Sequence, residues 1–362
     1  MNEQLSFIDL LPQAQAEALR PIKSTDWKWT MANDYPQEKN GLKVFSCFAC
    51  GGGSTMGYKL AGCDVIGCCE IDPKMNEVYV KNHKPKYNFL MDIRKFNEIP
   101  NEELPKELFN LDILDGSPPC TTFSMAGQRE ESWGKQKKFR EGQAEQTLDD
   151  LSFVFIDTVA KLRPKVVIME NVEGILLGNA IEYSRKIYQQ FKELGYKVIH
   201  KLLKGEQMGV PQARHRVFFI ATRLDVNLEE IDLNFNYEPI TFGEIKEGVG
   251  EKAACYELLC KAMPTDTALS DVLMRTEKRC SRFNEMIVWD DRVAPTVHTH
   301  GFYRGNDKCK FSLEDYRNAQ TFPRDYQFES TSQAAYICGM SVPPIMIKRI
   351  VNRLIESGVF YE

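Results

Sequence analysis

The sequence contains no long hydrophobic run and no pattern of a secretory leader. No stretch approaches the ~20 consecutive apolar residues of a transmembrane helix, which argues against a membrane protein. The opening MNEQLSFIDLLPQAQ carries acidic residues and lacks a basic segment followed by a long apolar core, so we expect no signal peptide. The 11 cysteines are odd in number and irregularly spaced, which favours reduced thiols and a cytoplasmic location.

The ligand pattern of a metal site is also missing. Cys47 and Cys50 form a Cys-x-x-Cys pair, but no second pair stands at the spacing of a zinc site, and His298 and His300 flank a single threonine. We therefore expect no bound metal. The formal net charge of −5 gives no sign of nucleic-acid binding, although a basic cleft can lie on an acidic protein.

Short apolar runs alternate with helical stretches from Lys43 to about Thr222. KVFSCFA, DVIGCCE, KVVIMEN and RVFFIAT have the β-branched and aromatic residues of strands, and LSFVFIDTVAKLR and AIEYSRKIYQQFKELG have helical periodicity. This alternation predicts an α/β fold, with a Rossmann-like, mostly parallel sheet and helices on both faces.

The chain divides into four predicted segments. Residues 1–40 are expected to be a peripheral extension, with DWKWTMANDYPQEKNG as a linker, and residues 41–224 form the main α/β domain. Periodicity is weak and charges are mixed in residues 225–290, as in a small second domain. Residues 291–362 contain two further helices, SLEDYRNAQ with Ser312 as its N-cap and PPIMIKRIVNRLIES, and are expected to return to the main domain.

A glycine cluster lies between the first predicted strand and the next helix. Gly51 and Gly53 of FACGGGSTMG let the backbone approach a ligand closely, with the N–H groups of the helix pointing at it. Glu70 follows about twenty residues later, after the second strand, where a carboxylate accepts hydrogen bonds from ribose hydroxyls. Asp92, after the third strand, is placed to reach an adenine amino group. Together these residues indicate an adenosine-containing cofactor without identifying it.

Three further motifs carry reactive or charged side chains. In DGSPPC, Pro118 and Pro119 hold Cys120 in a rigid, non-helical turn, which suits a nucleophile better than a core cysteine.

MENVEG places Glu170 and Asn171 at the carboxyl edge of the sheet. QARHR places Arg214 and Arg216 on the same side of an extended segment, because they are two residues apart. A buried carboxyl group, two guanidiniums and a thiol at one sheet edge are costly as mere packing. A structural ion pair of Glu170 with either arginine is the alternative.

In this order the motifs resemble the cytosine-5 DNA methyltransferase family. The resemblance is collinear from about Lys43 to Val351 and includes FACGGGSTMG, EID, GSPPC, ENV, QARHR, APTV, LEDYRNAQTFP and GMSVPP. It implies methyl transfer from S-adenosylmethionine to carbon 5 of a flipped-out cytosine in a specific short sequence of double-stranded DNA. Residues 41–224 then become the catalytic domain, and 225–290 a small target-recognition domain.

The resemblance also implies a role for each matched residue. Cys120 attacks carbon 6 of cytosine, while Glu170 holds N3 and the exocyclic amine and supplies a proton. Arg216 holds the O2 oxygen, Arg214 supports Glu170 or binds a phosphate, and Asn171 belongs to the same catalytic group. The implied S-adenosylmethionine-binding residues are Phe48, Gly51, Gly53, Glu70, Ile71, Asp92, Ile93, Pro119, Leu148 and Ser341.

The implied partner is double-stranded DNA, bound by a monomer in the nucleoid. The polar, basic loop after Cys120 is expected to close on DNA as a lid. QLSFIDL, near the N-terminus, resembles peptides that bind bacterial sliding clamps, with a helix that packs on the body as the alternative. The predicted DNA-binding residues are Ser124, Arg129, Lys137, Arg275, Lys278, Arg279 and Arg282.

Three positions depart from the family pattern. Ser46 replaces the usual aspartate of the first strand, Cys50 replaces a glycine and is expected to fit with a negative φ, and Met340 replaces the usual asparagine near the end of the chain. The sequence leaves alternatives. A tRNA cytosine-5 methyltransferase shares the core but usually carries a Cys-Phe-Thr tripeptide, which is missing here. A catalytically silent DNA-binding relative and a nicotinamide-dependent dehydrogenase explain fewer of the motifs.

Overall fold

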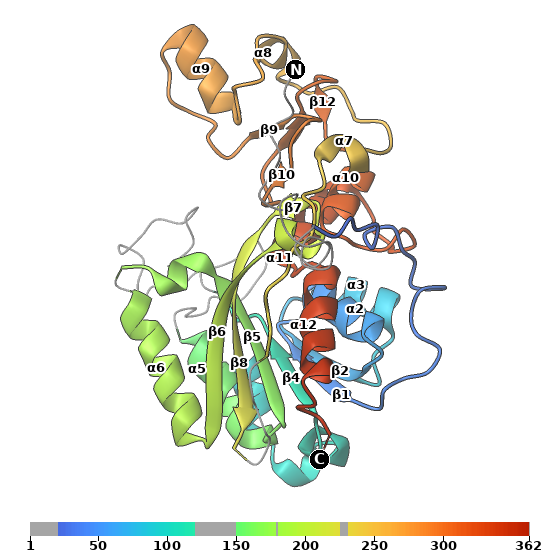
Figure 1. Cartoon of the computed structure of the whole chain (residues 1–362), viewed down its shortest axis with the longest axis vertical. Coiled ribbons are helices and arrows are strands. Elements are labelled where there is room, and N and C mark those ends of the chain that lie inside the picture. The colour runs from blue at the N-terminus through green and yellow to red at the C-terminus, as the bar shows by residue number, and fades with distance from the viewer. Residues whose placement is uncertain (1–20, 120–149, 179, 225–230, 362) are drawn as a thin grey trace, which may run out of the picture.

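A seven-stranded sheet forms the centre of the protein in the computed structural model, which describes residues 21–119, 150–178, 180–224 and 231–361 (Figure 1). The strand order is β3-β2-β1-β4-β5-β8-β6, and all neighbours are parallel except β8, which is antiparallel to both β5 and β6. This confirms the predicted Rossmann-like, mostly parallel sheet. The strands are β1 Lys43–Cys47, β2 Asp64–Glu70, β3 Tyr87–Leu90, β4 Ile113–Gly116, β5 Val166–Val172, β6 Tyr196–Lys204 and β8 His215–Arg223.

Helices cover both faces of the sheet, and the alternation of side chains along the strands explains why. In β5, Val166 and Ile168 belong to one buried cluster and Val167 and Met169 to another, as expected when successive side chains point to opposite faces. The first cluster includes α2, α3 and α12, and the second includes α4, α5 and α6. These helices are α2 Gly53–Leu60, α3 Pro73–His83, α4 Ile93–Glu98, α5 Leu151–Leu162, α6 Ala180–Glu193 and α12 Pro344–Glu356.

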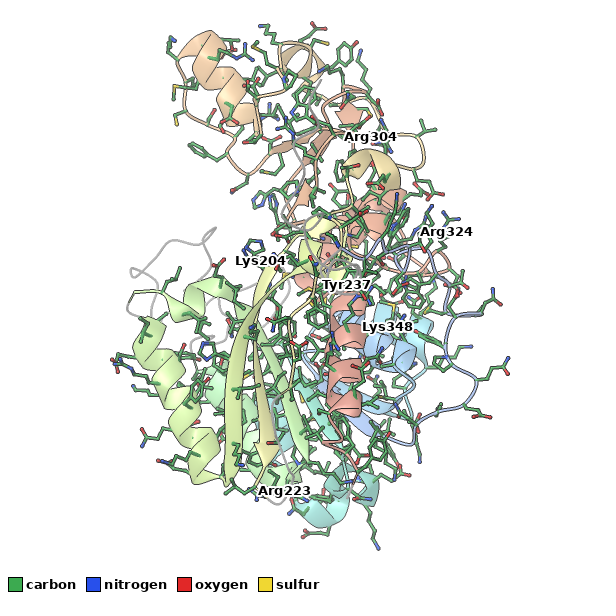
Figure 2. All side chains as sticks on the ribbon, viewed as in Figure 1. Lys204, Arg223, Tyr237, Arg304, Arg324 and Lys348 are labelled. Atoms are coloured by element: carbon green, nitrogen blue, oxygen red, sulfur yellow. The ribbon has the colours of Figure 1, made fainter. Side chains whose placement is uncertain are left out.

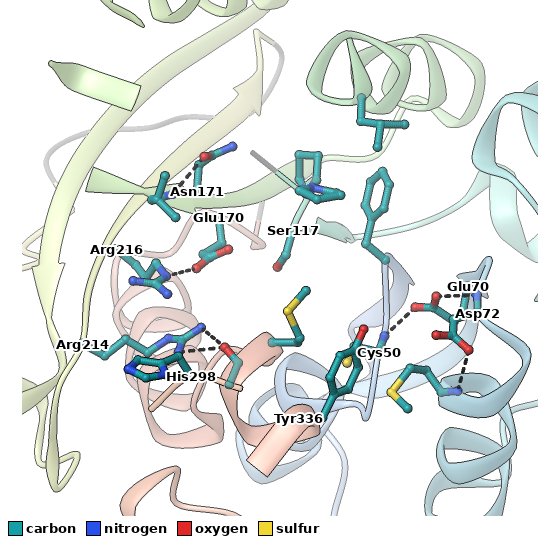
Figure 3. A pocket seen from close by; sticks show the side chains of 18 of the residues that line it. Cys50, Glu70, Asp72, Ser117, Glu170, Asn171, Arg214, Arg216, His298 and Tyr336 are labelled. Atoms are coloured by element: carbon teal, nitrogen blue, oxygen red, sulfur yellow. Dashed lines mark hydrogen bonds and ion pairs between the residues drawn. The ribbon is translucent and has the colours of Figure 1, made fainter. Parts of the chain in front are cut away.

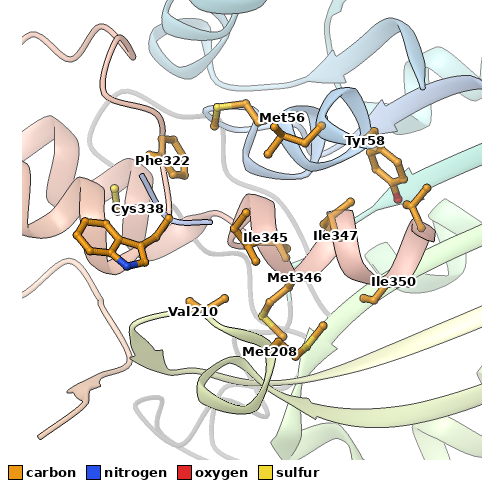
Figure 4. Close-up of a cluster of buried hydrophobic side chains, with 14 of the residues drawn as sticks. Met56, Tyr58, Met208, Val210, Phe322, Cys338, Ile345, Met346, Ile347 and Ile350 are labelled. Atoms are coloured by element: carbon orange, nitrogen blue, oxygen red, sulfur yellow. The ribbon is translucent and has the colours of Figure 1, made fainter. Parts of the chain in front are cut away.

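Helix α12 packs against α2 on the first face. Ile345, Ile347 and Ile350 are buried against Met56 and Tyr58 of α2 (Figure 4). Among the described residues, Thr331–Glu356 is the one stretch with the length and apolar composition of a membrane span. Here it forms two core helices, α11 Thr331–Met340 and α12, which are separated at Ser341–Pro343.

Two helix starts follow the prediction, and short 3₁₀ helices and two-residue strands connect the larger elements. Ser312 accepts a hydrogen bond from the backbone N–H of Asp315 and so caps α10 Leu313–Ala319 as predicted, while Pro344 occupies the first turn of α12. The 3₁₀ helices are η2 Asn101–Glu103, η3 Lys106–Phe109, η4 Glu173–Leu176 and η5 Gly205–Met208, and the two-residue strands β7 Gln212–Ala213 and β10 Ala294–Pro295 pair with each other.

A small second unit lies above the carboxyl ends of the main sheet in Figure 1. Its three-stranded sheet, β12-β11-β9, packs with two helices around Leu269, Ile287 and Trp289. Arg304 of this sheet forms a buried ion pair with Asp315 of α10, with Nε and Oδ2 2.7 Å apart (Figure 2). The sheet includes residues on both sides of position 290. The elements are α7 Phe242–Ile245, α8 Tyr256–Cys260, α9 Leu269–Glu277, β9 Met286–Val288, β11 Phe302–Arg304 and β12 Cys309–Lys310.

The described part of the N-terminal segment is not a peripheral linker. Trp27 and Trp29 are 5% and 4% exposed and belong to the same buried cluster as α12. The indole N–H of Trp29 donates to the backbone oxygen of Thr321 at 2.8 Å. The linker prediction is therefore wrong here, because two large aromatic rings find apolar partners that are close only in the folded chain. QLSFIDL lies outside the described residues.

Candidate active site

A cavity of about 550 Å³ opens at the carboxyl ends of β1, β2, β4 and β5 (Figure 3). One half is bordered by Phe48, Glu70 and Asp92, and the other by Glu170 and Arg216. The volume lies within the range of small-molecule sites. The residues that follow parallel strands therefore meet at one edge of the sheet, as the strand order requires.

The first half of the cavity has an acidic and apolar lining. Glu70 is buried at the end of β2, where its two carboxylate oxygens accept the backbone N–H groups of Cys50 at 2.7 Å and of Asp72 at 2.8 Å. Burial raises the pKa of Glu70, and these hydrogen bonds oppose the rise. Asp92 caps α4 by accepting the N–H of Arg94 at 2.8 Å. Of the predicted cofactor residues, Phe48, Glu70, Ile71, Asp92, Ile93 and Pro119 line this cavity.

Gly51, Gly53 and Ser341 do not line the cavity. A Cβ atom on Gly51 would lie 2.3 Å from Cγ2 of Ile337, and one on Gly53 would lie 2.2 Å from the backbone oxygen of Val342. These glycines allow the loop and α2 to pack closely against the C-terminal segment. Their surroundings therefore show a packing role, and their close approach to a ligand stays a prediction. Leu148 lies outside the described residues.

The second half of the cavity contains a buried ion pair. The Nε atom of Arg216 lies 2.8 Å from Oε1 of Glu170, and the two side chains are 15% and 12% exposed. Burial lowers the pKa of Arg216, while the charge of Glu170 opposes this effect. Asn171 accepts the N–H of Val172 at 2.9 Å, but its buried Nδ2 atom has no hydrogen-bond partner among the described residues. Within the described part of the chain, Oε2 of Glu170 and Nη2 of Arg216 have no hydrogen-bond partner and are available to a ligand that enters the cavity.

Arg214 lines the same cavity but does not pair with Glu170. Its Nη1 and Nη2 atoms both donate to the backbone oxygen of Gly339 at 3.2 Å, and Nη1 also approaches that of Val297 at 3.5 Å. Burial, followed by the charge of Arg216, lowers the pKa of Arg214 to about 9. The guanidinium thus links the end of α11 to the segment after β10, and the charge of Glu170 acts on it without a direct contact. Its support of Glu170 or of a phosphate stays a prediction.

The segment that carries Cys120 enters the cavity. Ser117, Pro118 and Pro119 line it directly after β4, whereas Cys120 lies outside the described residues. Asp115, beneath this turn, accepts the hydroxyl hydrogens of Ser46 at 2.6 Å and of Tyr58 at 3.0 Å. Ser46 and Asp115 are register partners on adjacent parallel strands. Ser46 replaces the usual aspartate of the family, and Asp115 on the neighbouring strand places a buried carboxyl group beside it.

Cys50 adopts a conformation that the sequence did not predict. Its φ is 45°, in the left-handed region that favours glycine, whereas a negative φ was expected. The side chain is partly buried, and desolvation, followed by the charge of Glu70, raises the pKa of the thiol to about 12. The expectation is wrong because the loop between β1 and α2 turns through alternating left-handed residues, with φ of 57° at Phe48, 45° at Cys50 and 81° at Gly52.

This conformation leads to a stability prediction. We expect Cys50→Gly to be more stable than Cys50→Ala by about 1 kcal/mol, because alanine keeps the left-handed strain and glycine removes it. Urea unfolding of the two variants measures the difference. At an ordinary extended or helical position the order would be reversed, so a more stable alanine variant would contradict the left-handed conformation.

The sequence did not single out His298 as a site residue, although it lines the cavity beside Arg214 (Figure 3). Its Nδ1 atom accepts the backbone N–H of His300 at 3.2 Å. Burial and the neighbouring His300 lower its pKa to about 4. Its position directly after the APTV motif was the available signal. Met340, which replaces the usual asparagine, also lines the cavity.

The predicted DNA-binding residues differ in their freedom to bind. Arg275 pairs with Asp266 at 2.6 Å, and Arg282 pairs with Glu285 at 2.5 Å. Both guanidiniums thus support the small unit itself. Lys278 is exposed at the end of α9, and Arg279 has a 62% exposed side chain that lies 3.5 Å from Glu277. Ser124, Arg129 and Lys137 lie outside the described residues.

Two curated relatives show which proteins the chain is similar to. Type II methyltransferase M.FnuDI of Fusobacterium nucleatum is 34% identical over 223 residues, which are 62% of this chain but 57% of that protein. M.NgoPII of Neisseria gonorrhoeae is 24% identical over 351 residues, 86% of this chain and 95% of that protein. The chain thus spans little more than half the length of the first relative and almost all of the second.

Solved structures share the fold. A Spodoptera frugiperda DNMT2 variant matches with a TM-score of 0.62 at 16% identity, over 87% of this chain and 100% of that chain. S. pombe Dnmt2 methyltransferase matches with a TM-score of 0.56 at 16% identity, over 87% and 97%. Residues 42–356 match the C-5 cytosine-specific DNA methylases as a family. Because this match covers most of the sequence, the chain belongs to the C-5 cytosine-specific DNA methylase family.

Proposed function

We propose that the protein transfers a methyl group from S-adenosylmethionine to carbon 5 of cytosine in a short sequence of double-stranded DNA. One observation carries the proposal: a single cavity joins the Glu170–Arg216 pair, the turn that leads into Cys120 and a compartment bordered by Glu70 and Asp92. Base recognition, nucleophile and cofactor would therefore meet within one space.

The first half of the cavity fits S-adenosylmethionine. Carboxylates at Glu70 and Asp92 suit the ribose hydroxyls and the adenine amino group, and Phe48 supplies an apolar wall. Ile71, Ile93 and Pro119 complete this compartment. Gly51, Gly53 and Ser341 would act indirectly, by holding the loop and α2 in place. The cofactor supplies an electrophilic methyl group when bound.

In the second half of the cavity, the cytosine ring would be activated by addition of a nucleophile. We assign the nucleophile to Cys120: its thiolate bonds to carbon 6, and the electron pair of the 5,6 double bond becomes available at carbon 5 for methylation. Glu170 would supply a proton to N3 during the attack, and Arg216 would hold O2. Loss of the carbon 5 proton then reforms the double bond and releases the thiolate.

The base must leave the helix to reach this cavity, because carbon 6 is not accessible within a stacked duplex. We assign target recognition to residues 225–290 of the small unit, where Lys278 and Arg279 present exposed charges. Sliding-clamp binding through QLSFIDL, a monomeric state and an association with the nucleoid remain predictions.

Base-resolution bisulfite sequencing tests the proposal. Unmethylated plasmid DNA is incubated with the protein and S-adenosylmethionine, and bulk tRNA is treated in parallel. We expect protected cytosines confined to one sequence context in the plasmid. Protection of tRNA alone, or no protection by a protein that binds the cofactor product S-adenosylhomocysteine, contradicts the DNA assignment.

The covalent step needs a separate measurement. DNA that carries 5-fluorocytosine at the identified target is expected to trap the protein, because the fluorine blocks the final elimination. Peptide mapping of the adduct should place it on Cys120, and unsubstituted DNA is the control. An adduct on Cys50, which also lies at the cavity, would show that the nucleophile is assigned wrongly.

A further inference from the structure

The loop between β1 and α2 has an unusual backbone. Phe48, Cys50 and Gly52 have φ values of 57°, 45° and 81°, so every second residue is left-handed. Two of the three carry side chains, for which this region is disfavoured. Such a conformation persists only where the surrounding structure determines it. Contacts with the surrounding structure therefore have to hold this loop in its conformation.

Two side chains donate hydrogen bonds to one backbone oxygen in the middle of the loop. The Gly51 oxygen accepts the hydroxyl hydrogen of Tyr326 at 2.7 Å and lies 3.0 Å from Nε2 of His83. Because a carbonyl oxygen can only accept, Nε2 of His83 must carry a proton. His83 and Tyr326 are 6% and 5% exposed, so water cannot readily replace either bond.

The two donors come from distant parts of the chain. His83 is the last residue of α3, and Tyr326 follows α10, 275 residues after Gly51. Their rings lie 6.0 Å apart, and Tyr79 packs against His83 at 4.7 Å. A Cβ atom on Gly51 would lie 2.9 Å from the Tyr326 hydroxyl. On the side away from the cavity, the loop therefore packs tightly against the buried side chains of His83 and Tyr326.

The other side of the loop faces the cavity. Phe48 and Cys50 line it, and the backbone N–H of Cys50 donates to Glu70, the proposed ribose ligand, at 2.7 Å. Neither His83 nor Tyr326 lines the cavity. A shift of the Gly51 peptide would move both the aromatic wall at Phe48 and the N–H group that orients Glu70.

We propose that His83 and Tyr326 are positioning residues that clamp the Gly51 oxygen and hold the loop in its cofactor-binding conformation. The inference rests on the proposed binding of S-adenosylmethionine in this half of the cavity. Burial keeps His83 neutral, with a pKa of about 3, so the clamp does not change its protonation near neutral pH. The C-terminal segment thus takes part in cofactor binding without touching the cofactor.

Calorimetric titration of the full chain with S-adenosylhomocysteine tests the clamp without DNA or turnover. Tyr326→Phe and His83→Phe each leave one donor to the Gly51 oxygen, so we expect Kd to rise about 3-fold in each. The double variant leaves that oxygen without a partner, and we expect a rise of about 30-fold or more, above the product of the single effects. His83→Gln keeps an N–H donor and should restore binding.

Tyr316→Phe is the matched control, because Tyr316 is equally buried at 5% exposure in the same cluster and does not contact Gly51. Its Kd should not change. Equal binding by the wild type and the double variant overturns the clamp alone. If the double variant does not fold, equal Kd values for His83→Phe and His83→Gln overturn it instead. A wild-type protein that does not bind S-adenosylhomocysteine overturns the cofactor assignment and this inference with it.

Discussion

Glu170→Gln is expected to lower kcat for DNA methylation by about 100- to 1,000-fold, the usual contribution of a positioned proton donor. Glutamine has nearly the same shape and still forms hydrogen bonds to a base, but it supplies no proton to N3. The loss should therefore fall on kcat more than on KM. Single-turnover kinetics with DNA of the identified target sequence measure it.

The surroundings of Glu170 make this test informative. Its Oε1 atom pairs with Arg216 at 2.8 Å within the cavity, so the variant also leaves a buried guanidinium without its anion. The thermal midpoint and the Kd for DNA are measured to separate this effect from catalysis. A purely structural ion pair would lower the midpoint and leave kcat of the folded fraction intact, which would contradict the proton role.

Glu206→Gln provides the matched control. Glu206 is also a partly buried glutamate with a basic partner: its Oε1 atom is hydrogen-bonded to Nε2 of His215 at 2.8 Å, and its side chain is 19% exposed. It does not line the cavity. We expect its kcat to stay within about 2-fold of the wild type, since the removed charge does not face the base.

The fold was predictable because its signals are local. Alternating apolar residues such as Val166 to Met169 identify strands, and Asp72 or Ser312 before a helix marks its start. The convergence of Glu70, Asp92 and Glu170 on one cavity followed from the rule that parallel strands end at a common edge.

The details that the sequence missed depend on partners far along the chain. Arg214 binds the backbone oxygen of Gly339, and Gly53 packs against that of Val342. No sequence pattern predicts which backbone oxygen a side chain will bind or pack against. The basic residues of the small unit pose a similar problem, because Arg275 is bound by Asp266 at 2.6 Å and only the folded structure shows which charges are free.

Asp115→Asn is expected to raise the stability of the protein at pH 8 and to do so much less at pH 5. Asp115 is 2% exposed, and burial raises its pKa from 3.8 to about 7. Its hydrogen-bonding neighbours are hydroxyl groups, Ser46 on β1 and Tyr58 on α2, while the charge of Glu170 on β5 raises the pKa further. The folded protein therefore favours the protonated form more than the unfolded chain does.

The direction of the pH dependence follows from this difference. The favourable contribution of the protonated carboxyl group is complete below pH 3.8 and is lost as the pH rises to about 7. This range corresponds to about 4 kcal/mol. Asparagine imitates the protonated acid, and its amide can donate to one hydroxyl oxygen and accept from the other hydroxyl. We expect the gain in unfolding free energy to be about 2–3 kcal/mol larger at pH 8 than at pH 5, or about 3 °C in Tm.

Asp112→Asn is the control at the start of the same strand. Asp112 pairs with Lys165 at 2.9 Å and accepts the backbone N–H of Lys43 at 2.8 Å, so its carboxylate is stabilised by a cation that Asp115 lacks. Its replacement should lower the thermal midpoint at pH 8. If Asp115→Asn also lowers the midpoint at pH 8, the buried hydroxyl groups stabilise an ionised Asp115. In that case the carboxyl group of Asp115, next to the turn that leads into Cys120, is ionised in the folded protein rather than neutral.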